Sequence, residues 1–481
     1  MLESLKKLAK ETAIYGISSI LSRFLNFLLV PFYTNFFSAR DYGLIANIYA
    51  YIAFLNVIFA FGMESSYMKY SSLAETEKEK KKIFSIAYLT ILVVSFISII
   101  FLIFSKDYFL VFFDLYEDKY LYYALAILFV DALNVLPYAE LRMSSKALFF
   151  ASTKSLNIFI NVLLNILFIA IYNFGVEGVL LANLIASLSN LAILLRTTIK
   201  SFIFSLNWVD LKKLLKFGLP YLPAGLAAIA LQVIDRPILL KLTSMEKVGI
   251  YQANYKLGVF MMLFVSMFQY AYQPFFLQRA KDKDAKEIFA NTLKYFLLAS
   301  SLILIFLSYF IENICQITIL GKSIIAKEYW TGLSIVPIVL LAYLFNGLYV
   351  NFTAGIFIKE KTIYSTIATS IGALSNIAFN FTLVPIYDII GAAVATLLSY
   401  MIMALILFFY SQKYYKIHYD YWNIFKIFFL ICSYLLLFYF LFYNKIQSIS
   451  IKFGVAISYI FFVFFLKIVS YKKLKKFLTR E

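Results

Sequence analysis

The sequence has little charge and almost no cysteine or histidine. Only 15% of its 481 residues are charged and 63% are hydrophobic, whereas about a quarter of the residues of an ordinary soluble domain are charged. No soluble fold hides that much apolar surface from water, so a soluble globular protein is excluded. Cys315 and Cys432 lie far apart, and His418 is the single histidine. We therefore expect no metal site, no disulfide framework and no bound cofactor.

The apolar residues stand in continuous runs, such as 86–104 and 427–443. Lipid offers no hydrogen-bond partners to the backbone, so runs of this kind must be helices. A span needs about 20 apolar residues. The sequence predicts an all-α polytopic membrane protein with fourteen transmembrane helices, at residues 12–37, 42–63, 83–104, 120–141, 153–173, 176–197, 216–241, 248–274, 292–311, 332–357, 363–385, 389–411, 424–443 and 452–470.

Lysine and arginine fix the orientation of these spans. Of the basic residues outside the spans or at their ends, 31 fall on the side that carries both termini and 9 on the other side. Cytoplasmic loops carry such an excess, so both termini are predicted to be cytoplasmic. The formal net charge of +18 is explained by these loops, and we expect no nucleic-acid partner.

The sequence contains the traces of an internal repeat. An offset of 206 aligns five pairs of residues: Pro31 with Pro237, Ser38 with Ser244, Gly43 with Gly249, Tyr49 with Tyr255, and Phe54 with Phe260. Further along, an offset of 213 aligns Gly178 with Gly391 and Ala182 with Ala395. The alternative is chance matching between apolar sequences. The repeat predicts two pseudo-symmetric six-helix lobes, at residues 1–205 and 206–412, followed by two C-terminal helices in 413–481.

Three cations lie well inside predicted spans, namely Arg23, Arg236 and Lys256, and a fourth, Lys467, is close enough to the cytoplasmic end of its span to reach the interface. A charge within the bilayer needs a partner or a water-filled cavity. Each of the first three shares a helix face with polar residues: Asn26 and Tyr33 with Arg23, Gln232 with Arg236, and Gln252 with Lys256. We interpret them as the lining of one electropositive cavity. The alternative is that each cation pairs with a carboxylate and only holds helices together.

Two acids, Asp131 and Asp235, are also intramembrane. Three residues follow Asp131 on the same helix face, namely Asn134, Tyr138 and Arg142. A buried carboxylate can exchange a proton, so both acids are candidates for coupling to H⁺ or Na⁺. The alternative is that each neutralises a nearby cation. Asp235 adjoins Arg236, but consecutive helical residues point about 100° apart and need not pair directly.

Two segments carry a family resemblance. The first contains YGISSILSRFLN at 15–26, VPFY at 30–33 and SARDYG at 38–43, and the second contains KFGLPYLPAG at 216–225 and IDRP at 234–237. With the span count, repeat and loop pattern, they make the chain resemble Wzx-type polysaccharide flippases. These belong to the multidrug/oligosaccharidyl-lipid/polysaccharide (MOP) exporter superfamily.

The resemblance implies two lobes around a cationic cavity that opens alternately to either side of the cytoplasmic (inner) membrane. The implied cargo is an undecaprenyl-pyrophosphate-linked oligosaccharide repeat unit, moved from the cytoplasmic to the outer leaflet. Arg23 and Arg236 stand where such a flippase can hold the pyrophosphate, with Lys256 and Arg142 as further candidates. Membrane lipids and the polysaccharide polymerase machinery are the implied partners.

Two alternatives remain. Lipid II flippases also have fourteen spans. A membrane glycosyltransferase or polymerase of the same pathway would be expected to carry a sizeable outer loop, and the loops here are short. We therefore expect a transporter and not an enzyme.

Overall fold

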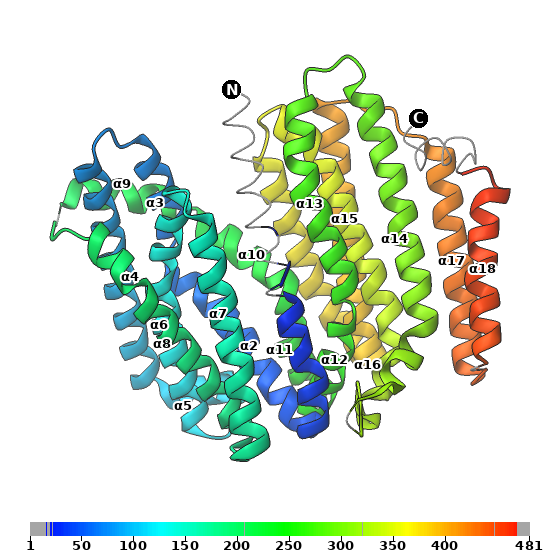
Figure 1. Cartoon of the computed structure of the whole chain (residues 1–481), viewed down its shortest axis with the longest axis horizontal. Coiled ribbons are helices and arrows are strands. Elements are labelled where there is room, and N and C mark those ends of the chain that lie inside the picture. The colour runs from blue at the N-terminus through cyan, green and yellow to red at the C-terminus, as the bar shows by residue number, and fades with distance from the viewer. Residues whose placement is uncertain are drawn as a thin grey trace. The chain divides into compact units, whose positions relative to one another are not determined.

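The computed structural model describes residues 16, 20–21, 23–205, 207–319, 321–446 and 448–468. Within this part of the chain, 11 helices are long and apolar enough to cross a membrane, and a shorter apolar helix covers Ile449–Phe465. The protein is therefore a nearly all-helical, multi-pass membrane protein (Figure 1). The first predicted span, 12–37, lies partly outside the described residues, and its described part is helical from 23 to 36. The count of fourteen spans stays a prediction.

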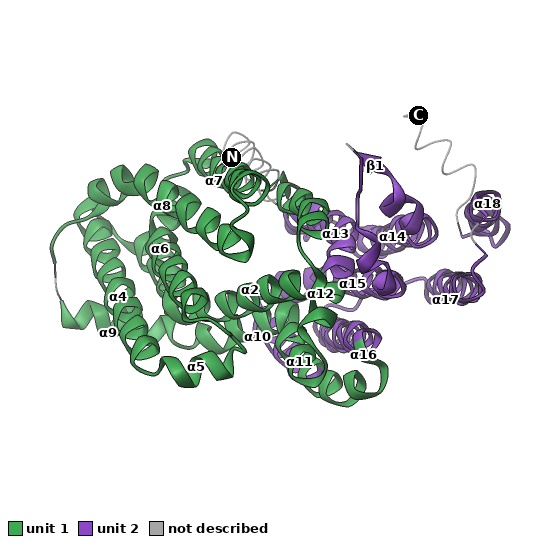
Figure 2. Ribbon diagram, turned by 90° about the horizontal axis from the view of Figure 1, so that it is seen from below, with its two compact units in different colours: residues 1–252, 376–388 green, residues 253–375, 389–481 purple. Residues whose placement is uncertain are grey.

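The chain forms two compact units, coloured separately in Figure 2. Unit 1 consists of Met1–Gln252 and Asn376–Asp388, and unit 2 consists of Ala253–Ser375 and Ile389–Glu481. The first boundary between these units falls at residue 252. The predicted lobe boundaries at residues 205 and 412 stay a prediction.

Over its described residues, unit 1 is built from helices joined by short turns and loops. Its elements are α2 (Ala39–Ala60), α3 (Met63–Leu73), α4 (Glu77–Phe104), α5 (Lys106–Phe112), α6 (Asp118–Met143), α7 (Ala147–Asn165), the π-helix η1 (Ile166–Ile171), α8 (Gly175–Ser201), α9 (Trp208–Gly218), α10 (Tyr221–Val233), α11 (Asp235–Leu242) and most of α12 (Met245–Leu257). Helix α6 packs against α2, α3, α4 and α8. It is largely buried, as expected of the central helix of a bundle.

Unit 2 contains the remaining elements. They are α13 (Val259–Arg279), α14 (Ala285–Gln316), the strands β1 (Thr318–Ile319) and β2 (Lys322–Ser323), the 3₁₀-helix η2 (Lys327–Ile335), α15 (Val336–Ile358), most of α16 (Ile363–Tyr414), α17 (Tyr421–Tyr443) and α18 (Ile449–Phe465). The two strands pair antiparallel, with Thr318 opposite Ser323. Helix α15 packs against α13 and α14, while α17 and α18 pack on α14 and on each other (Figure 1).

Local sequence signals set the start of α4. The Thr76 side chain accepts a hydrogen bond from the backbone N–H of Glu79, and the Glu79 carboxylate reaches back to the N–H of Thr76. This capping box satisfies two donors that a helix start leaves unpaired. The basic residues of the loop thus occupy the first turns, and the apolar run 83–104 begins directly after them.

Several predicted spans are interrupted in the structure. The span predicted at 216–241 is divided among α9, α10 and α11, with a break at Ile234. Pro237 explains this break, because it has no N–H to donate to the carbonyl of Val233. The span predicted at 248–274 is divided between α12 and α13 at Gly258. Conversely, α16 contains the two spans predicted at 363–385 and 389–411, and Asp388, with φ 54° and ψ −134°, interrupts the helix between them.

Two glycines of the predicted repeat make a reciprocal contact within unit 1. A Cβ added to Gly43 would meet the carbonyl oxygen of Met245, and a Cβ added to Gly249 would meet the carbonyl oxygen of Ala39. Ala39 and Met245 are themselves 206 residues apart. The start of α2 and the start of α12 therefore touch backbone to backbone, related by the offset that the sequence shows. Only residues without a side chain permit this approach.

Two further motifs recur at corresponding positions. Ser38 accepts a hydrogen bond from the N–H of Asp41 at 3.2 Å, and Ser244 accepts one from the N–H of Lys247 at 3.3 Å. Later in each half, an asparagine donates to the asparagine one turn before it. Asn165 donates to the backbone and side-chain oxygens of Asn161, and Asn380 does the same to Asn376. Each asparagine of the first pair lies 215 residues before its counterpart, which is close to the offset of 213 that aligns Gly178 with Gly391. These motifs support the predicted repeat.

Candidate functional site

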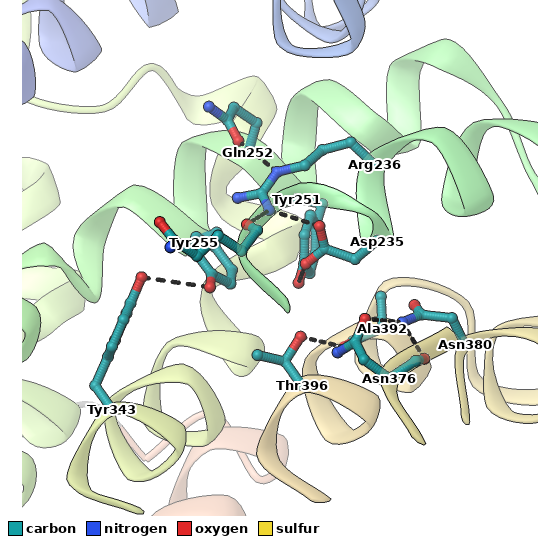
Figure 3. Close-up of polar contacts among 11 residues, drawn as sticks. Asp235, Arg236, Tyr251, Gln252, Tyr255, Tyr343, Asn376, Asn380, Ala392 and Thr396 are labelled. Carbon is teal, nitrogen blue, oxygen red and sulfur yellow. Dashed lines mark hydrogen bonds and ion pairs between the residues drawn. The ribbon is translucent and has the colours of Figure 1, made fainter. Parts of the chain in front are cut away.

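Arg236 lies in a tight polar cluster at the start of α11 (Figure 3). Its Nη1 donates to the carboxylate of Asp235 at 2.5 Å and to the backbone oxygen of Gln232 at 2.5 Å. Its Nε donates to the side-chain oxygen of Gln252 at 3.1 Å. Tyr251 donates its hydroxyl proton to the other carboxylate oxygen of Asp235 at 2.6 Å. The sequence placed four of these five residues at an intramembrane site, and the structure brings all five together.

The cluster is buried and its two charges compensate each other. Asp235 is 2% exposed and Arg236 is 4% exposed. A buried ion pair is maintained when its remaining donors and acceptors are satisfied, and Gln252 and Tyr251 provide that satisfaction here. In this arrangement the guanidinium is already bound by protein groups. An incoming phosphate oxygen must therefore compete with the Asp235 carboxylate.

Arg23 and the polar residues expected to line the cavity with it have different environments. Arg23 and Asn26 are exposed on the helical stretch 23–36. Tyr33, on the same stretch, is buried and donates a hydrogen bond to Asn165 at 2.8 Å. Gln232 is exposed, and its side-chain amide donates to the carbonyl of Ala228. Their role as one cavity lining stays a prediction.

Lys256, the third expected cation, is half-buried on the part of α12 that belongs to unit 2. Gln252 lies one turn before it and bonds to Arg236 within unit 1. The assignment of Lys256 to the pyrophosphate also stays a prediction.

A polar cavity of about 440 Å³ lies within unit 1. Its wall includes the face of α6 that the sequence picked out, namely Asp131, Asn134, Tyr138 and Arg142. The prediction that these four residues share one face is confirmed. Arg142 forms an ion pair with Glu64 of α3, which also lines the cavity. We call this space the amide cavity, because asparagines from four helices line it.

Helices α7 and α8 supply the residues that our sequence reasoning missed. They are Lys154 and Asn157 on α7, and Asn183, Ser187 and Asn190 on α8. Ser187 donates a hydrogen bond to Asp131 at 2.6 Å, and Tyr138 donates one to Asn190 at 2.7 Å. The signal was present in the sequence, since polar residues at positions i, i+4 and i+7 of an apolar span share one helix face.

A second cavity of unit 1, of about 830 Å³, lies among α3, α4 and α9. Four lysines and two acids line it, namely Lys69, Lys82, Lys213, Lys216, Glu79 and Asp210. Lys82 pairs with Asp210 at 2.6 Å, and the Lys69 ammonium lies 3.8 Å from the centroid of the Phe217 ring. This cavity is basic, whereas the amide cavity carries as many carboxylates as cations.

A family model for polysaccharide biosynthesis proteins matches residues 8–280, more than half of the chain. The chain belongs to this family. No curated protein matches the sequence.

The fold of this polysaccharide biosynthesis protein is similar to those of solved transporters. One is the lipid II flippase MurJ in an inward closed conformation, which is 18% identical in sequence and superposes with a TM-score of 0.75. The match covers 94% of this chain and 99% of the MurJ chain. Another is a multidrug resistance MATE transporter of the MOP superfamily in an inward-facing conformation, which is 13% identical with a TM-score of 0.66. The match covers 81% of this chain and 94% of the transporter chain. A MATE transporter in an outward-facing conformation is 14% identical with a TM-score of 0.59, and the match covers 84% of this chain and 95% of the transporter chain.

These findings confirm the resemblance to MOP-type polysaccharide flippases. The solved proteins that share the fold are a flippase and transporters. That this chain is a transporter and not an enzyme stays a prediction.

Proposed function

We propose that this protein is a flippase that moves undecaprenyl-pyrophosphate-linked oligosaccharide repeat units from the cytoplasmic to the outer leaflet of the cytoplasmic membrane. The observation that carries the proposal is the family match to polysaccharide biosynthesis proteins on a chain with a flippase-like fold. Such cargo carries a pyrophosphate and sugar hydroxyls across about 30 Å of hydrocarbon. A path lined by fixed cations and polar side chains lowers the free-energy barrier to this crossing.

The proposed transport cycle uses fourteen spans with both termini in the cytoplasm, and alternates between inward-open and outward-open states. Arg23, Arg236, Lys256 and Arg142 are the proposed pyrophosphate ligands. Arginine suits this task because its planar guanidinium binds phosphate oxygens through two parallel hydrogen bonds and stays charged. In the structure, Arg236 and Arg142 are held by Asp235 and Glu64. We propose that the cargo phosphates displace these carboxylates when the site is loaded.

The proposed driving force is an H⁺ or Na⁺ gradient that acts through Asp131 or Asp235. A cation bound to such a carboxylate cancels its charge, so its occupancy changes the electrostatic balance against the anionic cargo. Downstream polymerisation of the flipped units would add further pull, which makes the polymerase machinery a proposed partner.

A second candidate cargo is lipid II. The similarity in fold to the lipid II flippase MurJ favours it. Both candidates carry a polyprenyl pyrophosphate, so the arginine assignments are the same for both. They differ in the saccharide and in the peptide that lipid II carries.

The test is flipping in proteoliposomes that contain the purified protein and one fluorescent lipid-linked substrate at a time. We expect transport of the oligosaccharide-linked lipid and little transport of lipid II. Arg23→Ala should abolish transport while the protein still inserts and elutes as a single species. Arg236→Ala should also abolish transport, and because it leaves Asp235 buried without its counter-charge, its stability is measured beside its transport. Arg23→Lys should keep partial activity, because a point charge lacks the guanidinium fork. Full activity of both alanine variants would remove the pyrophosphate ligands from the proposal, and transport of lipid II alone would reassign the cargo.

A further inference from the structure

The amide cavity is neutral overall, although it is strongly polar. Its two carboxylates, Asp131 and Glu64, are balanced by Lys154 and Arg142. A free phosphate would need an excess of cations. While Glu64 stays paired with Arg142 and Asp131 stays charged, as in this structure, the charge balance points to a neutral polar ligand, and a phosphate can bind to Arg142 only after it displaces Glu64.

The cavity wall holds polar groups whose hydrogen-bonding capacity is unused. Asn134 is 5% exposed, and its amide donates to the backbone oxygen of Ser187, but its Oδ1 has no partner. The Nε of Arg142 is buried and also has no partner. Buried polar groups of this kind are rare in folded proteins unless a ligand or water completes them.

Two more polar side chains of the wall have unused capacity. Among the described residues, none accepts a hydrogen bond from the half-buried amide of Asn56, and none forms an ion pair with Lys154. The Lys154 ammonium lies 4.1 Å from the centroid of the Tyr138 ring instead. The wall thus offers both donors and acceptors to a ligand.

This combination matches the chemistry of sugars. A hydroxyl group both donates and accepts, and so does a carboxamide, whereas a lipid tail would leave the amides unsatisfied. Sugar rings also have apolar faces, and the rings of Tyr138 and Phe150 line the same cavity with centroids 5.2 Å apart. The volume of about 440 Å³ lies within the usual range of small-molecule sites, about 300–1,000 Å³.

From these observations we infer that the amide cavity is a carbohydrate-binding subsite, which takes neutral sugar residues of the lipid-linked cargo. The inference rests on the proposed flippase function and adds a place for the saccharide. Along α6 the wall extends from Asp131 to Arg142, 11 residues or about 16 Å of helix. That length is about half the thickness of the hydrocarbon core, so the subsite would contact the saccharide along about half of its path across the membrane.

The experiment compares two ligands on the purified full-length protein in detergent. One is the undecaprenyl-pyrophosphate-linked repeat unit extracted from cells that produce this protein, and the other is undecaprenyl pyrophosphate without sugar. The dissociation constant of each is measured for the wild type and for Asn56→Leu. Asn56 is the informative position, because its amide makes no hydrogen bond whose loss would disturb folding. Asn134→Leu is a second, more buried variant, and Asn291→Leu, at an exposed site on α14, is the matched control.

We expect the wild type to bind the glycosylated lipid at least tenfold more tightly than the sugar-free lipid. Asn56→Leu should lose about three- to tenfold of the affinity for the glycosylated lipid, the loss expected for one neutral hydrogen bond. Its affinity for the sugar-free lipid should not change, and Asn291→Leu should behave as the wild type. Equal binding of both lipids by the wild type, or an unchanged preference in Asn56→Leu, would overturn the subsite while leaving the flippase function in place. Binding of neither lipid by the wild type would overturn the proposed function and the subsite with it.

Discussion

The carboxylate of Asp235 and the guanidinium of Arg236 are in direct contact, with 2.5 Å between Oδ1 and Nη1, although the two residues are consecutive in the sequence. Asp235 is the first residue of α11, directly after the break at Ile234. The long Arg236 side chain folds back toward the preceding turn, where its Nη1 also contacts the carbonyl of Gln232, and it thereby spans the angle of about 100° between consecutive side chains. The position of Asp235 also places a negative charge in the first turn of a helix, where the helix dipole favours it.

Removal of the carboxylate should destabilise the protein strongly. Asp235→Asn leaves the buried Arg236 without its counter-charge, and breaking a buried pair in this way costs about 3–5 kcal/mol of unfolding free energy. The matched control is Asp388→Asn, which breaks the exposed pair with Lys247, with side chains 39% and 45% exposed. That change should cost at most about 1 kcal/mol. Thermal unfolding of the purified variants in detergent measures both, and equal melting temperatures for the two would contradict the buried pair.

The reciprocal glycine contact makes a second prediction. Gly43→Ala or Gly249→Ala introduces a methyl group against a backbone carbonyl of the other helix. A backbone oxygen cannot rotate away as a side chain can, so each substitution should cost about 1–3 kcal/mol or more. The double variant should be no better than either single one, because each methyl group meets a different carbonyl.

Gly454→Ala is the control for this contact. Gly454 lies within α18, and an added Cβ there would meet no atom within 4 Å. Alanine favours helix more than glycine does, so the control should be neutral or stabilising by up to about 1 kcal/mol. Wild-type melting temperatures for Gly43→Ala and Gly249→Ala would show that the two helices do not touch in the membrane.

Sequence periodicity predicted the helical class and the helix face that lines the amide cavity. It did not predict features that have no period. The face of α6 with Asp131 and Arg142 followed from the spacing alone, because the helix is continuous there. The pairing of Asp235 with Arg236 depends on how the long Arg236 side chain folds back, which periodicity does not contain. Lys154 stands at the start of the predicted span 153–173, and periodicity alone does not indicate that it lines the amide cavity. Only the packing of α7 and α8 beside α6 shows which polar residues face the same space.

The predicted topology can be tested by cysteine labelling. Cys432 is exposed and Cys315 is buried, so Cys432→Ser provides the background. Single cysteines at Tyr116 and Ile319, which are 65% and 60% exposed, should react with an impermeant thiol reagent in intact cells. Cysteines at Lys78 and Lys416, also exposed, should react only after permeabilisation. This pattern follows from the excess of 31 basic residues to 9 on the cytoplasmic side, and the inverse pattern would reverse the orientation of every span.

The last prediction concerns energy coupling through Asp131. Its carboxylate accepts a hydrogen bond from Ser187 at 2.6 Å and faces the amide cavity, where two acids balance two cations. Binding of H⁺ or Na⁺ to Asp131 would leave that balance positive by one charge. Asp131→Asn imitates the neutralised state with nearly the same shape, and Asn can still accept the hydrogen bond from Ser187. The variant should therefore flip cargo at a rate that no longer responds to an imposed gradient.

The measurement is flipping in proteoliposomes with an imposed pH gradient or an imposed Na⁺ gradient, in separate experiments. The wild type should respond to one of the two, which identifies the coupling ion. Asp107→Asn, at an exposed position of α5, changes the same charge outside the cavity and should respond as the wild type does. If Asp131→Asn keeps the full response, then the coupling carboxylate lies elsewhere and Asp131 only balances the charge of Lys154, since Arg142 is paired with Glu64. Asp235 would be the next residue to test, with the destabilisation measured for Asp235→Asn taken into account.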